Sequence, residues 1–291
     1  MHKQLLVLLI ALHWAGFTWS LETPNLSANI DALFSNYDSA DVPGCAIGVI
    51  QAGTYLHARG YGSANLEHGI PIGLDSVFRI GSVSKQFTAT VVAILADRGD
   101  LNLDSDVHEY LPDLMEYGAE VTVRQMIHHL SGMGDYEMTE VYEVSPGKAF
   151  RFGNEDYWTI EEFYQRVRKQ PLALAPMQRF EYSNIAYFLL SQVVERVSGL
   201  TLRAFAEKEL FGPLNMTSTF FNDNVDGVVP HRADGYTPIT ADTFEILMTN
   251  LDWVGDGGVY TTLNDFIKWD RALSAGTIPG GKAVLDLLFE P

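Results

Sequence analysis

The chain has 291 residues, of which 47% are hydrophobic and 19% are charged, and its formal net charge is −18. This length suits one large domain or two lobes that share an interface. The excess of acidic side chains repels phosphate backbones and anionic membranes, so we expect a protein that binds no nucleic acid.

The first 20 residues have the pattern of a secretory signal peptide. His2 and Lys3 precede an apolar stretch over residues 5–17, and Ser20 is a small residue near the expected cleavage point. The apolar stretch is short for a membrane-spanning helix. We therefore expect residues 1–20 to be removed and the mature chain to be exported, to the periplasm or out of the cell, with no membrane span left. The alternative is an uncleaved membrane anchor.

Hydrophobic periodicity predicts the main elements in chain order. The expected elements are a helix over 27–37, a hairpin of strands 45–50 and 55–61 joined by 51–53, a helix from Ser82 that Gly99 closes, a helix over 184–198 that stops at Gly199, a short helix capped by Thr201, and a helix over 262–273.

The order of these elements predicts the fold class. Strands come first, helices occupy the middle and the end is mixed, which is typical of an α+β protein with a helical lobe set against a sheet lobe. We expect one domain over 21–291. Its sheet lobe covers about 21–80 and 200–291, and its helical lobe covers about 82–198.

Ser82 and Lys85 form the first candidate catalytic pair. If a helix begins at Ser82, residues three apart share a face, so the hydroxyl and the amine can touch. A serine hydroxyl needs a neighbour that takes its proton, and a lysine near the positive end of a helix can do so. The alternative is that Ser82 only caps the helix and Lys85 is a solvated surface charge. Ser145 and Lys148 have the same spacing, but the Pro-Gly turn between them argues against a shared face.

Tyr182 and Asn184 form the second candidate group. They make the only Tyr-x-Asn sequence among the 13 tyrosines of the chain. A phenol beside a lysine ammonium loses its proton more easily, so Tyr182 could accept the serine proton and pass it to a leaving group. The Asn184 amide offers an acceptor and two donors to a substrate amide. The alternative is that Tyr182 packs in the core and Asn184 caps the following helix.

Five segments carry a resemblance to a known family. They are 78–89 with Ser82 and Lys85, 99–112, 127–132 with the His-x-Ser-Gly turn, 180–184 with the Tyr-x-Asn motif, and 257–262 with a glycine turn. In this order they resemble the segments of class C β-lactamase-related serine hydrolases. That group also includes penicillin-binding proteins, D-alanyl-D-alanine carboxypeptidases, esterases and D-amino-acid amidases.

The resemblance implies both a fold and a site. The implied fold is β-lactamase/transpeptidase-like, with an antiparallel sheet flanked by helices, a helical lobe and the site between them. Ser82 is implied as the acylated nucleophile, Lys85 and Tyr182 as the proton relay, and Asn184 as a substrate contact.

Two features depart from the family pattern. The family has Pro-Gly ahead of the tyrosine motif, whereas this chain has Pro176-Met177, and we expect this change to alter a turn. The family also carries a Lys or His followed by Thr or Ser and then Gly on a late strand, which supplies an oxyanion donor. No such motif follows Asn184. We therefore expect the sequence to be truncated at its C-terminus, without the closing strands.

The sequence predicts a serine hydrolase that cleaves an amide or ester through an acyl-enzyme on Ser82. Its substrate would be a small molecule or peptide, such as a β-lactam, a D-Ala-D-Ala-type peptide, a carboxylic ester or a D-amino amide. The alternative is a catalytically incomplete relative that binds peptidoglycan-like ligands, or an inactive fragment. We expect no cofactor and no metal ion, since the adjacent His128 and His129 lack the spacing of a zinc motif.

Overall fold

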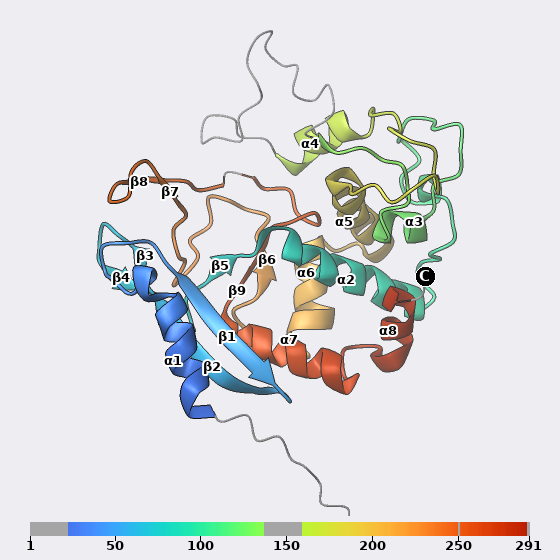
Figure 1. Ribbon diagram of the computed structural model, residues 1–291. Helices are drawn as coiled ribbons and strands as arrows, with labels where there is room; N and C mark the ends of the chain where they lie inside the picture. The colour runs from blue at the N-terminus through green and yellow to red at the C-terminus, as the bar shows by residue number, and fades with distance from the viewer. Residues whose placement is uncertain (1–22, 137–158, 250, 290–291) are drawn as a thin grey trace, which may run out of the picture.

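The computed structural model describes residues 23–136, 159–249 and 251–289 (Figure 1). The expected signal peptide over 1–20 lies outside the described residues, and so does the pair Ser145 and Lys148. Within the described segments, no helix combines the length and the apolar character that crossing a membrane requires.

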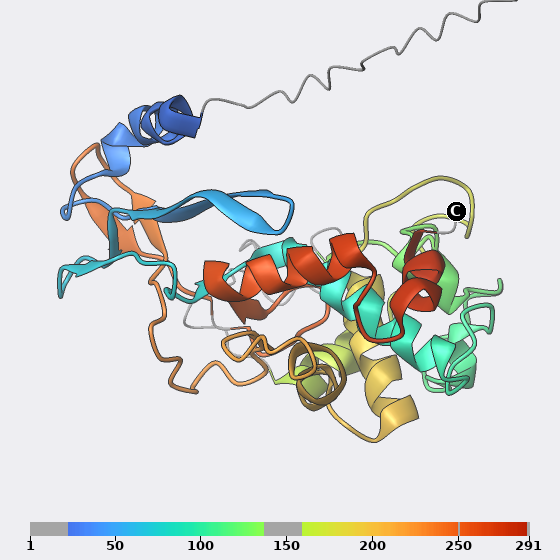
Figure 2. The same cartoon turned by 90° about the horizontal axis from the view of Figure 1, so that it is seen from below.

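The N-terminal part is a hairpin held between two helices. Helix α1 (Thr23–Leu33) is followed by a 3-10 turn, Ser35–Tyr37, and then by strands β1 (Cys45–Gln51) and β2 (Thr54–Tyr61). The strands pair antiparallel, which confirms the expected hairpin. Figure 2 shows α1 and α7 (Leu263–Ala275) on opposite faces of this hairpin.

The remaining strands are short. They are β3 (Ser63–Asn65), β4 (Ile70–Pro71), β5 (Phe78–Arg79), β6 (Phe220–Phe221), β7 (Tyr236–Pro238), β8 (Phe244–Ile246) and β9 (Val259–Thr261). In the described residues the strands form four small sheets, of which β5-β9-β6 is the largest. The pairings within these named strands are antiparallel. Helices together with small antiparallel sheets confirm the α+β class.

Helix α2 (Lys85–Asp97) lies at the centre of the helical part. Around it and beyond it lie α3 (Val123–Ile127), α4 (Ile160–Val167), α5 (Asn184–Ser198), α6 (Leu202–Ala206), a π-helical turn Glu207–Phe211, α8 (Gly281–Phe289) and a 3-10 turn Val107–Glu109. Helix α2 packs against α5, α6 and α8. Its residues from Phe87 to Leu95 are buried, so α2 is enclosed on most of its faces. A helix this enclosed gives its first residue, Lys85, a fixed position.

The helix ends predicted at Gly99, Gly199 and Thr201 agree with the structure, whereas the helix predicted over 27–37 does not, because α1 spans Thr23–Leu33 and Ser35–Tyr37 form a 3-10 turn. Gly99 and Gly199 have φ angles of 76° and 70°, the left-handed conformation in which glycine ends a helix without steric cost. Thr201 and Thr262 each accept a hydrogen bond from a backbone N–H of the helix that follows. These helix ends therefore depend on local sequence features rather than on tertiary contacts.

Candidate functional site

Ser82 lies on a tight turn that joins β5 to α2. This turn, Gly81–Ser84, is a 3-10 helix, so the α-helix begins at Lys85 and the expected start at Ser82 was wrong. The Ser84 hydroxyl donates to the Gly81 carbonyl at 2.6 Å and accepts from the Val259 N–H at 3.0 Å. The neighbouring strand β9 therefore fixes the turn, while the Ser82 side chain stays exposed.

Lys85 is buried beneath this serine, with only 6% of its surface exposed. Its Nζ lies 3.4 Å from Ser82 Oγ and donates to Asn184 Oδ1 at 2.6 Å and to the backbone carbonyl of Asp256. Ser82 makes no capping hydrogen bond. The alternative of a capping serine and a solvated lysine is therefore wrong.

Asn184 is held in one orientation by a carboxylate. Its Nδ2 donates to both oxygens of Asp135, at 3.1 and 2.8 Å, which directs Oδ1 toward Lys85. The cap of helix α5 is Ser183, whose hydroxyl accepts from the Ala186 N–H, so the alternative of Asn184 as the cap is wrong. Both ends of the Asn184 amide are engaged inside the protein, and the amide fixes the position of the lysine amine.

The ring of Tyr182 covers Lys85 from the solvent side. Lys85 Nζ lies 4.8 Å from the ring centroid, within the range of a cation–π contact. Tyr182 is 40% exposed, so the alternative of a core tyrosine is wrong. Among the described residues, no partner hydrogen-bonds to its hydroxyl. The structure thus brings Ser82, Lys85 and Asn184 together through polar contacts and adds Tyr182 through its ring.

His129 supports this arrangement, although the sequence indicated only that it lacks the spacing of a zinc motif. Its ring stacks on Tyr182 with centroids 4.6 Å apart, and its Nδ1 accepts from the Ser183 N–H at 3.1 Å. Burial, with a smaller contribution from the charge of Lys85, lowers the pKa of His129 to about 4. The imidazole is therefore neutral at neutral pH and holds the tyrosine loop in place.

Asp256 is the second group that the sequence did not indicate. It is 6% exposed, and its Oδ2 accepts from the Tyr136 hydroxyl at 3.1 Å. Its Oδ1 has no hydrogen-bond partner in the part of the chain that the structure describes. Burial raises the pKa of Asp256, and the nearby charge of Lys85 opposes that rise. In the sequence, the position of Asp256 within the glycine cluster 255–258 was the one signal that could have indicated its role.

The loop that carries Asp256 approaches α5 closely. Gly255 has a φ angle of 111°, and a Cβ atom there would lie 2.5 Å from the Tyr187 carbonyl oxygen. Only glycine fits such a position. This close approach brings the Asp256 carbonyl to Lys85.

Pro176 and Met177 form the turn before the tyrosine motif. Met177 adopts the left-handed conformation with a φ angle of 62°, and the Gln178 N–H donates to the Ala175 carbonyl at 3.1 Å. Pro176 followed by a residue with positive φ is the pattern of a type II turn. Methionine thus adopts here the conformation that glycine favours, and the expected alteration of the family's turn stays a prediction.

The site contains carboxylates and imidazoles, but they do not converge as metal ligands. In residues 23–136, 159–249 and 251–289, no group of three His, Cys, Asp or Glu side chains could hold a metal ion. The arrangement instead offers an exposed hydroxyl, a buried amine beneath it and an aromatic cover, which are the parts that nucleophilic catalysis needs.

The chain is similar to several known proteins, in sequence or in structure. The chain is 27% identical over 246 residues to a D-aminopeptidase of Gluconobacter oxydans, covering 84% of this chain and 44% of that protein. It is 33% identical over 216 residues to the esterase EstB of Burkholderia gladioli, covering 70% of this chain and 53% of that protein. Among solved structures, the octameric penicillin-binding protein homologue from Pyrococcus abyssi matches with a TM-score of 0.73 and 23% identity, over 91% of this chain and 60% of that one.

These relatives are longer than the chain, which spans between 44% and 60% of the length of the first curated proteins it matches. The likeness to solved structures supports the penicillin-binding and β-lactamase type of fold. A family model described as Beta-lactamase matches residues 30–288. The chain therefore belongs to the beta-lactamase family, a serine hydrolase family with amidase, esterase and peptidase members.

Proposed function

We propose that this chain hydrolyses an amide or an ester through an acyl-enzyme on Ser82. The observation that carries the proposal is the set of acceptors around Lys85 Nζ. Two of them, Asn184 Oδ1 and the Asp256 carbonyl, can only accept hydrogen bonds, whereas the Ser82 hydroxyl can donate or accept. A neutral lysine amine has two hydrogens and one lone pair. If the hydrogens go to the two pure acceptors, the lone pair faces Ser82.

This geometry suits the removal of the serine proton. Ser82 Oγ would attack the substrate carbonyl carbon while its proton moves to Lys85. The ammonium so formed keeps its contacts with Asn184 and the Asp256 carbonyl. The proton would then pass to the leaving amine or alcohol, with the Tyr182 hydroxyl as the carrier that the family resemblance implies. Water would release the acid from Ser82 by the reverse sequence.

The substrate would be a β-lactam, a D-Ala-D-Ala-type peptide or a carboxylic ester. Relatives named D-aminopeptidase, penicillin-binding protein and esterase support this range. The same nucleophile serves all three because groups around the site, rather than the nucleophile itself, set specificity.

Hydrolysis by matched variants tests the proposal. Nitrocefin, p-nitrophenyl acetate and a D-alanyl-D-alanine peptide are offered to the protein, to Ser82→Ala and to Ser35→Ala. Ser35 is a fair control because it is also an exposed serine in a 3-10 turn. We expect at least one substrate to be cleaved by the protein and by Ser35→Ala but not by Ser82→Ala. Cleavage that survives in Ser82→Ala, or no cleavage of any substrate, contradicts the proposal and favours a ligand-binding relative.

We also propose that the protein is exported to the periplasm or out of the cell. The basic start, short apolar stretch and small residues of segment 1–20 support this. N-terminal sequencing of the protein recovered from fractionated cells is the test. A mature chain that begins near residue 21 outside the cytoplasm is expected, and an uncut chain in the membrane fraction contradicts it.

A further inference from the structure

A cavity of about 500 Å³ lies beside the candidate site. Its walls come from β5, β9, the segments 233–235 and 247–249, and Leu251. The apolar and aromatic lining residues are Phe78, Tyr136, Leu247, Met248, Leu251 and Tyr260. Two other cavities of about 500 and 510 Å³ are lined by different segments, and neither includes Tyr136, which links the first cavity to Asp256.

The cavity is connected to the catalytic groups by short structural links. Tyr136, in its wall, donates to Asp256, whose carbonyl accepts from Lys85. Arg79, also in its wall, lies on the strand that leads into the turn of Ser82. A Cβ atom built on Gly257 would lie 3.5 Å from Arg79 Nη2 and 3.7 Å from the Gly81 carbonyl oxygen. The guanidinium therefore reaches the backbone beside the nucleophile turn.

Arg79 lies at the surface, and its charge opposes the rise in the pKa of the buried Asp256. Its side chain is exposed, and it takes part in none of the ion pairs found among the described residues. The cavity also contains the carboxylate of Asp234, but that group accepts from the Asn65 amide at 2.7 Å. An arginine at the wall of an apolar cavity is suited to a carboxylate, which its planar guanidinium can bind through two hydrogen bonds.

We infer that this cavity selects substrates that carry a carboxylate on an apolar segment, with Arg79 binding the carboxylate. The inference rests on the proposed function and adds a substrate class to it. The apolar segment would lie against the aromatic and aliphatic walls, and the scissile carbonyl would lie at Ser82. Monoesters and monoamides of dicarboxylic acids have this form, and so do esters whose leaving group bears a carboxylate.

Paired esters of equal length test the inference. The p-nitrophenyl monoester of adipate is compared with p-nitrophenyl hexanoate, and 4-acetoxybenzoate is compared with phenyl acetate. We expect Arg79→Gln to lower kcat/KM for the anionic member of at least one pair by roughly 10- to 100-fold, the loss typical of a hydrogen bond to a charged group. The neutral member should change by less than about threefold, since it makes no such bond. The affected pair identifies the side of the scissile bond that enters the cavity.

Two more variants test whether the effect depends on the position of the lost charge and on the space in the cavity. Lys282→Gln removes one positive charge from exposed helix α8, far from the cavity lining, and should leave the ratio of anionic to neutral ester unchanged. Leu247→Trp narrows the cavity from an exposed position and should weaken both six-carbon esters while sparing p-nitrophenyl acetate.

The outcomes for the inference and for the proposed function differ. If p-nitrophenyl acetate is cleaved through Ser82 but Arg79→Gln changes both members of each pair equally, the inference is wrong and the proposed function stands. If nitrocefin or the peptide acylates Ser82 but no ester does, the inference alone is wrong. If no ester, nitrocefin or peptide acylates Ser82, both are wrong.

Discussion

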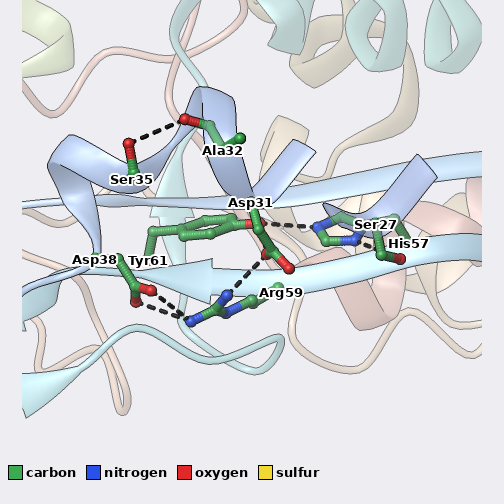
Figure 3. Close-up of polar contacts among 8 residues, drawn as sticks. All are labelled: Ser27, Asp31, Ala32, Ser35, Asp38, His57, Arg59 and Tyr61. Carbon is green, nitrogen blue, oxygen red and sulfur yellow. Dashed lines mark hydrogen bonds and ion pairs between the residues drawn. The ribbon is translucent and has the colours of Figure 1, made fainter. Parts of the chain in front are cut away.

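Two exposed serines in the described segments lie in 3-10 turns, and their surroundings differ. Ser82 is followed three residues later by the buried Lys85, whereas Ser35 is followed three residues later by Asp38. The Ser35 hydroxyl donates to the Ala32 carbonyl at 2.9 Å (Figure 3). Asp38 is directed outward and pairs with Arg59 at 2.8 Å. The same local turn thus carries a candidate nucleophile in one place and a surface turn in the other.

The polar groups around the two turns also differ in how fully they are satisfied. Near Ser35, the Tyr61 hydroxyl donates to Asp31 and lies 3.0 Å from His57 Nε2, and Arg59 pairs with Asp31 (Figure 3). Since a carboxylate only accepts, His57 Nε2 must donate to Tyr61. Near Ser82, one buried oxygen of Asp256 has no partner within the described segments. The polar groups of the cluster that joins α1 to β2 thus have hydrogen-bond partners. In the candidate site, by contrast, one carboxylate oxygen has no partner within the described residues.

Replacing Lys85 with methionine should make Ser82 as unreactive as Ser35. The apolar side chain fills similar space but offers no lone pair to Ser82, so we expect hydrolysis to fall by about 10²- to 10⁴-fold, the usual contribution of a general base. Steady-state kinetics with the best substrate of the panel measures this. Activity that stays within about tenfold, in a folded protein, would remove Lys85 from the mechanism.

Replacing Asp256 with asparagine should reveal the cost of its buried carboxyl. Because burial raises the pKa of Asp256 in the folded protein, the folded state binds its proton more tightly than the unfolded chain does. This group then destabilises the fold as pH rises above the unfolded pKa, and below it the cost is absent. Urea unfolding should show Asp256→Asn gaining stability over the parent as pH rises from acidic to neutral. A difference that does not change with pH contradicts this account.

Tyr61→Phe should affect only the stability of the other cluster. Tyr61 is 1% exposed, and without its hydroxyl the buried His57 Nε2 loses its partner. We expect unfolding to become easier by about 1–3 kcal/mol, the usual cost of an unsatisfied buried polar group, with kcat/KM unchanged. Thermal or urea unfolding measures the loss. Loss of activity at unchanged stability would link α1 to catalysis, against our expectation.

Asp38→Lys recreates the serine-lysine spacing at the surface turn. We expect the new pair to stay unreactive toward a fluorophosphonate, because no buried acceptors hold the new amine beside Ser35. The variant loses an exposed ion pair with Arg59, and such solvent-screened pairs contribute little to stability. The experiment is done in a Ser82→Ala background, and labelling at Ser35 would show that spacing alone is sufficient.

The sequence predicted the parts of the fold that depend on local signals. The hairpin followed from residues 51–53, where Ala52 and Gly53 have φ angles of 48° and 72°. The end of α5 followed from Gly199. The proximity of Ser82 and Lys85 followed from their spacing, although a 3-10 turn rather than an α-helix brings them together.

The sequence could not predict the groups that hold the lysine amine. Asp135 lies 49 residues before Asn184, and Asp256 lies 171 residues after Lys85. Such pairs meet only after the chain has packed, so no local period encodes them. Met177 shows a second limit, because it adopts a left-handed conformation that local rules assign to glycine, and its N–H donates to the Leu130 carbonyl at 2.8 Å.

Covalent labelling of the nucleophile tests the central claim most directly. The protein is treated with a fluorophosphonate, digested and mapped by mass spectrometry, with Ser82→Ala and Ser35→Ala treated in parallel. We predict one adduct on the peptide that contains Ser82, present in Ser35→Ala and absent in Ser82→Ala. An adduct on another serine, or none on the folded protein, would contradict the assignment of Ser82 as the nucleophile.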